Sequence, residues 1–500
     1  MYHVVMLMLL LLLLHPTSVQ SMCLGVAKCN CESVADGSGQ VINCRNAGLT
    51  AVPTFDPRGS SQAPYVELTL AGNQISSIPQ RAFTGLQFRR LDLSDNPLVQ
   101  LHQEAFSGLE RVLHELRLTL SQAAAFPVSA ISPLTRLRIL HVASFARTQL
   151  PPRALSTLSK LAELKLTSGS LSTLNVGDLD AQRGSLQTLV LYGNEFSTVP
   201  TEALSTATML TSLDLSHNQI SSLPGDVFAG LINLNVLDLS NNGLGCRLDA
   251  AAFRGVGDRL RTLTMKLCQL GDRDVEALRQ LQAVAELILS HNSIANLPAN
   301  LFNRMRSLRR LHLDNNRLQT ITRSTFSSTF STLEVLDLSH NPLSSVPEDA
   351  FLDLNYLQEL RLDGVTTIQL GSNSFSPQHR RVLRTLSVRS SGIGERLWSI
   401  VLNTEGLNSL LASDASISSI PDFAFRRNAA LQTIDLGSNS ISSLTQRSVY
   451  GLANSLTTIN LHGNRITTIH RCTFYGFRSV SLYTALVCCY SDNVVFIHVI

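Results

Sequence analysis

The residues of this 500-residue chain that could do chemistry match no catalytic motif. The sequence contains no G-x-x-x-x-G-K-[ST], no H-E-x-x-H and no G-x-S-x-G. Two short glycine motifs, Gly255-Val256-Gly257 and Gly392-Ile393-Gly394, lack the rest of a dinucleotide-binding fingerprint. We therefore expect a protein that is not an enzyme and binds no cofactor.

Three histidines recur in the same Ser-His-Asn tripeptide, namely His217, His291 and His340. Because the tripeptides lie far apart in the chain and at the same place in a repeat, exposed turn residues are favoured over metal ligands. We predict no metal site.

Nine cysteines indicate an oxidising compartment, and four of them form a C-x5-C-x-C-x12-C cluster at Cys23, Cys29, Cys31 and Cys44. Cys29 and Cys31 are too close along one strand face to bridge each other, so each is expected to pair elsewhere. A metal site is the alternative, but paired C-x2-C spacings are missing. The pairing of the other five cysteines is left open; they are Cys246, Cys268, Cys472, Cys488 and Cys489. For Cys268 a buried thiol is favoured over a bridge to Cys246.

The N-terminal residues resemble a targeting segment. Residues 4–14 are an unbroken apolar run, followed by a small, polar stretch ending at Ser21. The run is too short for a membrane-spanning helix, which needs about 20 apolar residues. We predict a cleaved secretory signal peptide over residues 1–21, with a membrane anchor as the alternative.

A repeated motif must position everything else, and residues 210–224, LTSLDLSHNQISSLP, show it most clearly. The spacing L-x-x-L-x-L-x-x-N-x-L predicts a short strand with inward leucines, followed by a turn that the asparagine ties to backbone. One copy cannot bury its leucines alone, so the copies must stack into a solenoid with a parallel sheet. Seventeen copies are marked by their ninth residues, which are Asn73, Asn96, Ser121, Phe145, Gly169, Asn194, Asn218, Asn242, Cys268, Asn292, Asn316, Asn341, Val365, Ser391, Ala415, Asn439 and Asn464.

Together with the signal peptide, these copies divide the chain into four predicted segments. A cysteine-rich N-terminal cap covers residues 22–62, and an α/β solenoid of about 17 repeats covers 63–477. An apolar tail over 478–500 fits no repeat and is split by Ser491, Asp492 and Asn493, which leaves neither half long enough to span a bilayer. We interpret the tail as the end of a shortened array, with Cys472, Cys488 and Cys489 as a rudimentary cap.

After the asparagine, most copies continue with a proline and then a phenylalanine. Proline breaks regular helix, so the return side of each coil should consist of short turns and extended or 3₁₀ segments. The phenylalanines are expected to stack as an internal spine; they include Phe83, Phe106, Phe228, Phe253, Phe302 and Phe351.

Seven copies lack the asparagine, and three of these are consecutive, at Ser121, Phe145 and Gly169. Serine and cysteine can still offer a side-chain group to the turn, whereas the other substitutes cannot. We therefore expect a looser asparagine ladder in coils three to five. Tolerated drift in a long array is favoured as the explanation, with a bend or a functional segment as the alternative.

The residues between the leucines are the ones available for recognition. Net charge is only +3 and no long run of one sign occurs, which argues against nucleic acid or an anionic membrane as partner. The fifth-position residues alternate in sign and polarity, which suits a protein ligand or receptor. Two candidate sites stand out against ordinary solvated surface: Lys165, Val190 and Tyr192, and a basic zone of Arg309, Arg310, His312, Arg361, Arg384 and Arg389.

The capped array, with LDLSHNQISSLPGDVFAGL and LERVLHELRL, resembles extracellular leucine-rich repeat proteins of the chaoptin, Slit and Toll-ectodomain kind over residues 23–477. The resemblance implies a horseshoe with a parallel concave sheet, and a cap in which Cys23 pairs with Cys31 and Cys29 with Cys44. It also implies secretion or display on the cell surface, with adhesion or ligand binding on the concave face.

The resemblance leaves other functions open. The alternatives are innate immune recognition, a regulatory or inhibitory subunit of a secreted enzyme, and a structural matrix protein. Self-association is a further candidate interaction, and membrane attachment is left open.

Overall fold

The computed structural model describes residues 22–23, 26–34, 39–55, 65–242, 247–298, 300–326, 332–469, 473–477 and 481–483. The predicted signal peptide and Cys246, Cys472, Cys488 and Cys489 lie outside this part, as do the side chain of Cys23 and most of the predicted tail. The chain forms two compact units, Met1–Glu195 with Glu202–Ala207, and Phe196–Thr201 with Thr208–Ile500.

Each coil begins with a strand whose leucines point into the core. In β12 (Ser212–Asp214) the central Leu213 is buried while its two neighbours are half-buried. The same alternation recurs in most other strands of the two units, because successive side chains of a strand point to opposite sides. The solenoid of parallel strands predicted from the repeats is therefore confirmed.

The first unit starts with an antiparallel cap that leads into parallel coils. β1 (Met22–Cys23) pairs with β2 (Val26–Ser33), which pairs with β3 (Gln40–Asn43), both antiparallel. β3 then pairs in parallel with β4 (Tyr65–Thr69), and parallel pairing continues through β6 (Arg90–Leu98), β8 (Glu115–Leu120), β9 (Ile139–Ala143), β10 (Glu163–Thr167) and β11 (Thr188–Val190).

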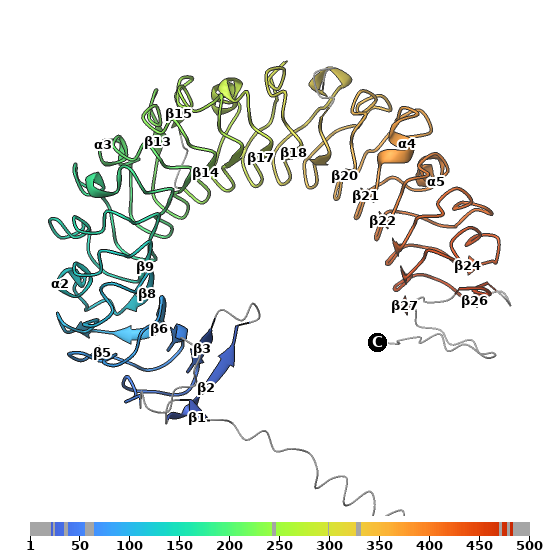
Figure 1. Cartoon of the computed structure of the whole chain (residues 1–500). Helices are drawn as coiled ribbons and strands as arrows, with labels where there is room; N and C mark the ends of the chain where they lie inside the picture. The colour runs from blue at the N-terminus through green and yellow to red at the C-terminus, as the bar shows by residue number, and fades with distance from the viewer. Residues whose placement is uncertain are drawn as a thin grey trace, which may run out of the picture. The chain divides into compact units, whose positions relative to one another are not determined.

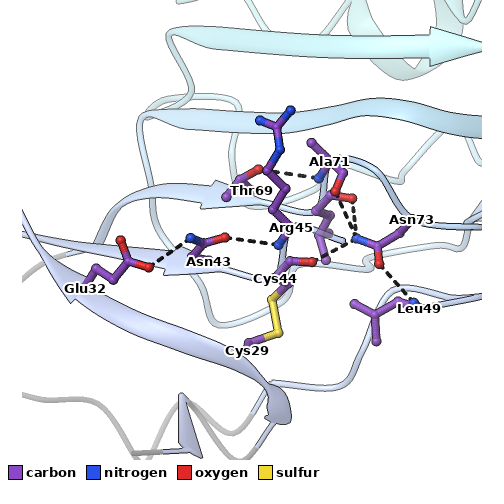
Figure 2. The surroundings of a disulfide bond; sticks show 10 residues. Cys29, Glu32, Asn43, Cys44, Arg45, Leu49, Thr69, Ala71 and Asn73 are labelled. Carbon is purple, nitrogen blue, oxygen red and sulfur yellow. Dashed lines mark hydrogen bonds between the residues drawn. A yellow bond between two sulfur atoms is a disulfide. The ribbon is translucent and has the colours of Figure 1, made fainter. Parts of the chain in front are cut away.

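A disulfide lies within the cap, and a hydrogen bond to Cys44 links the cap to the first coil. Cys29 on β2 is bonded to Cys44, which follows β3, as Figure 2 shows. The carbonyl of Cys44 accepts a hydrogen bond from Asn73 Nδ2 at 2.9 Å, and Asn73 Oδ1 accepts one from the Leu49 amide (Figure 2). The predicted Cys29–Cys44 pair is thus present, and Cys31 is also disulfide-bonded.

The second unit is parallel throughout its main sheet. Its strands are β12, β14 (Val236–Asp238), β16 (Thr262–Thr264), β17 (Glu286–Ile288), β18 (Arg310–His312), β19 (Val335–Asp337), β20 (Glu359–Arg361), β21 (Thr385–Ser387), β22 (Ser409–Leu411), β23 (Thr433–Asp435), β25 (Thr458–Asn460) and β27 (Ser481–Tyr483). Within this unit the strands follow the inner side of the curve, and α4 and α5 lie on the outer side (Figure 1). The sequence did not predict β27, whose three residues come from the apolar tail.

The return segments are mostly turns, as predicted, with short strands and helices between them. Two-residue strands pair in parallel: β5 (Ser77–Ile78) with β7 (Gln100–Leu101), β13 (Ser222–Leu223) with β15 (Arg247–Leu248), and β24 (Ser443–Leu444) with β26 (Thr468–Ile469). The 3₁₀ segments are η2 (Asp180–Gln182), η3 (Asp274–Gln280) and η4 (Arg323–Phe326).

Short α-helices were not predicted. They are α2 (Val128–Ile131), α3 (Thr201–Leu204), α4 (His379–Val382) and α5 (Arg396–Val401). Among the described residues, we find no helix with the length and apolar character needed to cross a membrane.

The predicted phenylalanine spine is confirmed. Its six members are all buried. Phe83 and Phe106 stack with ring centroids 6.1 Å apart, and Phe228 and Phe253 stack at 6.3 Å. The spacing follows from the repeat, because residues at one phase of neighbouring coils lie side by side.

The asparagine ladder links each coil to the one before it. Asn292 donates from Nδ2 to the carbonyls of Met265 and Leu289, both at 2.8 Å, and its Oδ1 accepts from the amides of Cys268 and Leu270. One side chain therefore satisfies four buried backbone groups in two neighbouring coils, which would otherwise cost free energy.

The substitutes for asparagine behave differently from one another. The Cys268 thiol donates to the Leu239 carbonyl at 3.1 Å, and Ser391 Oγ donates to Val388, as predicted for groups that can reach the turn. Ser121 Oγ is buried without a hydrogen-bond partner among the described residues, as expected for a looser ladder in coils three to five. The strands of coils one to five, β4, β6, β8, β9 and β10, are five to nine residues long, against three in most coils of the second unit.

Close packing between coils explains the two Gly-x-Gly triplets. A Cβ on Gly257 would lie 2.1 Å from the Gln280 carbonyl oxygen, and one on Gly392 would lie 2.1 Å from that of Thr366. Both contacts are with backbone of a neighbouring coil, so only glycine fits. These glycines serve packing between coils.

Candidate functional site on the inner face of the strands

We call the surface formed by the third, fifth and seventh residues of each repeat, counted from its first leucine, the inner face of a unit. The register of the sheet brings equivalent positions side by side. In the first unit the fifth-position column runs Thr69, Asp92, Arg117, His141, Lys165 and Val190. In the second it runs Asp214, Asp238, Thr264, Ile288, His312, Asp337, Arg361, Ser387, Leu411, Asp435 and Asn460.

Ion pairs join the charged residues of the inner face in the first unit. Glu163 Oε1 lies 2.8 Å from His141 Nε2 and 2.9 Å from Lys165 Nζ. Burial raises the pKa of Glu163, but the hydrogen bonds from Lys165 and His141 outweigh it and hold the pKa below its ordinary value. Burial lowers the pKa of His141, although Glu163 opposes this effect. Glu163 therefore ties two neighbouring coils together.

Two more pairs extend this network toward the cap. Arg90 Nε lies 3.4 Å from Glu67, and Arg117 Nη2 lies 2.6 Å from Glu115. Acidic and basic side chains are interleaved over these coils, so the inner face of the first unit has no single-sign patch there.

The structure brings together the predicted candidates Lys165, Val190 and Tyr192. Lys165 and Val190 are register partners on β10 and β11. Tyr192 follows two residues after Val190, on the same side of the strand, and its side chain is 39% exposed. This corner of the inner face therefore places an aromatic ring beside an apolar and a charged side chain.

Three arginines of the predicted basic zone are paired with carboxylates. Arg309 pairs with Glu334, Arg361 with Glu359, and Arg389 Nη2 lies 3.3 Å from Asp435. Arg384 Nη1 donates to the Gly406 carbonyl at 2.9 Å, and Arg310 is exposed on β18. The zone is therefore a mixed network of both signs.

Sequence reasoning missed the acids of this network. Glu334 and Glu359 are second- and third-position residues of their coils, and Asp435 lies two coils beyond Arg389. The period-2 pattern of the strands could have flagged Glu359, because it shares the face of Arg361. It could not have paired residues 46 positions apart, as in Arg389 and Asp435.

Two fifth-position aspartates are partly removed from water. Burial raises the pKa of Asp238, and the nearby Asp214 carboxylate adds to the shift. Burial likewise raises the pKa of Asp337, together with the charge of Asp314. The column thus places acids close to one another at two points of the second unit.

The Ser-His-Asn histidines lie in the turns, as predicted. His217, His291 and His340 are exposed and have φ values of 54°, 56° and 57°, in the left-handed region used by tight turns. They sit beyond the strands at the edge of the inner face.

The repeat architecture and its sequence place the protein in a class. The chain belongs to the leucine rich repeat family, whose model matches residues 66–119, 184–256, 258–318, 306–368 and 405–466, more than half of the chain. The predicted membership of the leucine-rich repeat family is confirmed at this level.

Relatives of known sequence agree with this class. Chaoptin of Tribolium castaneum is 38% identical over 79 residues, which is 15% of this chain but only 10% of chaoptin. Human podocan-like protein 1 is 28% identical over 392 residues, which is 72% of each protein.

Solved structures confirm the fold. The Toll protein of the Drosophila Toll–Spatzle complex matches with a TM-score of 0.62 and 20% identity, covering 92% of this chain and 69% of that one. The TLR13–ssRNA13 complex matches with a TM-score of 0.58 and 21% identity, covering 85% of this chain and 72% of that one.

Proposed function

We propose that this chain is an extracellular or cell-surface recognition protein that binds a protein ligand or receptor through its inner face, in cell adhesion or ligand capture. One observation carries the proposal. The strands hold the third-, fifth- and seventh-position side chains in register, while the leucines between them supply the core. The inner face is therefore a surface that can vary without cost to the fold.

The chemistry of this face favours protein over nucleic acid. Aspartates stand in the fifth-position column of the second unit at Asp214, Asp238, Asp337 and Asp435. Such acids repel a polyanion, whereas interleaved charges of both signs complement a protein surface.

The cap supports a location outside the cell. The Cys29–Cys44 disulfide is of a kind that persists in oxidising compartments. We therefore propose residues 1–21 as a secretory signal peptide, 22–62 as the cap, 63–477 as the repeat array and 478–500 as an atypical end.

Two contact zones are proposed, one on the inner face and one that combines inner-face residues with Arg309 and Arg384, which stand at the second position of their repeats. The first is the corner at Lys165, Val190 and Tyr192, where an exposed aromatic ring adjoins apolar and charged groups, a combination enriched in protein interfaces. The second is the network around Arg309, Arg310, His312, Arg361, Arg384 and Arg389, where a partner's charges would compete with the internal pairs.

Affinity capture from an extracellular extract tests the proposal. The purified wild-type chain is compared with Lys165→Ala/Tyr192→Ala and with Arg309→Ala/Arg310→Ala/Arg361→Ala. The control is Arg426→Ala/Arg427→Ala/Arg447→Ala, which removes three exposed arginines from the return segments. We expect the wild-type chain and the control to capture the same protein. One or both of the other two variants should bind that protein at least tenfold more weakly.

The captured species separates the alternatives. Self-association in a bead-aggregation assay supports adhesion, a secreted protease supports a regulatory subunit, and microbial glycan supports immune recognition. Equal affinities of all variants for the captured species would contradict the inner face as the binding surface.

A further inference from the structure

We propose that His312, Asp314 and Asp337 form a binding site for a divalent transition-metal ion, with Zn²⁺ as the probe, on the inner face of the second unit. Each residue offers one ligand atom, and these atoms all lie within 4.8 Å of one another. Among the described residues, no other group of three His, Cys, Asp or Glu side chains converges in this way.

The register of two neighbouring strands explains the convergence. His312 on β18 is the register partner of Asp337 on β19, so the two side chains stand side by side. Asp314 follows two residues after His312 and therefore shares its face. The buried leucines Leu311, Leu313 and Leu336 fix this orientation, because they hold the alternate side of both strands in the core.

The distances are close to those of an occupied site. Nitrogen and oxygen ligands bind Zn²⁺ at about 2.0 to 2.2 Å in a tetrahedral arrangement, so two ligands of one ion lie roughly 3.4 Å apart. Ligand atoms up to 4.8 Å apart therefore approach each other by roughly 1.4 Å on binding, through rotation of the half-buried side chains.

Neighbouring groups orient both carboxylates. Ser290 Oγ donates to Asp314 Oδ1 at 2.5 Å, and Asn315 Nδ2 donates to Asp314 Oδ2 at 2.9 Å. The Ser339 amide donates to Asp337 Oδ1 at 3.0 Å. A carboxylate has about four acceptor positions, so each keeps capacity for an ion while its orientation is fixed.

The charges around the site favour a cation. Asp314 and Asp337 are carboxylates whose oxygens lie within 4.8 Å of each other, so their negative charges repel. The Arg361 guanidinium also faces Asp337, but Glu359 pairs with it. His291 Nε2 is 4.0 Å from Asp314 Oδ2 and neutral unless protonated. A bound cation would relieve the repulsion that no neighbouring group fully neutralises.

The donor set points to the class of metal. An imidazole nitrogen with two carboxylates suits Zn²⁺ and similar ions, whereas Ca²⁺ takes six to eight oxygen ligands. Three protein ligands leave at least one coordination position for water or for a carboxylate of a partner. The inference does not depend on the proposed recognition function, because ion binding is measured on the protein alone.

The test is Zn²⁺ binding to untagged, chelator-treated full-length protein, measured by isothermal titration and by metal analysis after dialysis. Two ligand variants, His312→Ala and Asp337→Asn, are compared with wild type. Two matched controls, His340→Ala and Asp238→Asn, remove a nearby histidine and a fifth-position aspartate outside the group. We expect one site whose affinity falls at least tenfold in both ligand variants and is unchanged in both controls.

A second measurement guards against misfolding. Circular dichroism and the unfolding midpoint without metal should match wild type for each variant, while Zn²⁺ should raise the midpoint only where the site is intact. Co²⁺ in place of Zn²⁺ should give absorption bands that the His312→Ala variant loses. Equal Zn²⁺ affinity in wild type and both ligand variants, or no binding to wild type, would overturn the proposal.

Discussion

Asparagine suits the ninth position because its amide offers two donors and an acceptor in one small group. Asn439 shows the full arrangement. Its Nδ2 donates to the carbonyls of Ala412 and Leu436, and its Oδ1 accepts from the amides of Ala415 and Ile417. Two neighbouring coils thus meet on one side chain that is only 7% exposed.

We predict that Asn439→Ala lowers the free energy of unfolding of the second unit by about 2 to 4 kcal/mol, because buried backbone groups lose their partners. Ser440→Ala, at the exposed next position, should change it by less than about 0.5 kcal/mol. Urea unfolding followed by circular dichroism measures both. Similar losses for the two variants would contradict the anchoring role of Asn439.

A second residue-scale prediction concerns pH. Burial lowers the pKa of His379 from 6.5 to about 4, although the Leu354 carbonyl and Asp353 oppose the shift. Between these values the unfolded chain binds a proton that the folded chain does not. Neutral His379 therefore contributes about 3 kcal/mol to the free energy of unfolding above about pH 6.5, and this contribution is lost as pH falls toward 4.

The His379→Gln variant isolates this effect. Its unfolding free energy should fall less steeply than that of wild type between pH 6.5 and 4, whereas His340→Gln, in an exposed turn, should follow wild type. Urea titrations across this range provide the comparison. Parallel curves for His379→Gln and wild type would exclude His379 as the group responsible.

At the scale of the elements, two devices hold neighbouring coils together. One is the spine of phenylalanines beneath the outer side, and the other is the parallel ladder of strands on the inner side. In coils three to five, which lack asparagine, the Ile139–Ala143 strand pairs with its neighbour over five residues. Longer strands are not confined to these coils, because β4 and β6 have five and nine residues in coils that keep Asn73 and Asn96.

We predict that Phe228→Ala destabilises the second unit by about 3 to 5 kcal/mol, because it empties a fully buried position stacked on Phe253. Phe423, which is 40% exposed and contacts Tyr450, is the matched control. Phe423→Ala should cost less than about 1.5 kcal/mol. Hydrogen exchange of the flanking coils and urea unfolding both report the difference, and equal costs would rule out the spine as the dominant packing element.

At the scale of the whole molecule, the ends of an array need covering because a terminal coil has a neighbour on one side only. The N-terminal cap supplies this cover through antiparallel strands and the Cys29–Cys44 disulfide. Asn73 carries the connection onward into the first coils, since it bonds to both Cys44 and Leu49.

We predict that Cys29→Ser/Cys44→Ser destabilises the cap by about 3 kcal/mol, the effect of opening a loop of 15 residues. Hydrogen exchange should rise in β2, β3 and β4 and stay unchanged in the second unit, because contacts in a solenoid are between neighbours. Increased exchange throughout the second unit would contradict this local effect.

The sequence by itself determined the repeat, its strands, the buried leucines, the asparagine turns and the phenylalanine spine. It could do so because each is a local pattern at a fixed phase, and stacking simply repeats it. The fifth-position column followed from the same pattern. The pairing of Cys29 with Cys44 was predicted from the family resemblance instead.

Only the tertiary structure decided what the inner-face residues do to one another. It paired Arg389 with Asp435 across 46 residues, neutralised much of the predicted basic zone and set His312 beside Asp314 and Asp337. It also added β27 from the tail and gave β4, β6, β8, β9 and β10 lengths of five to nine residues. These features depend on the reach and direction of side chains across coils and on strand register, which no periodic pattern in one copy specifies.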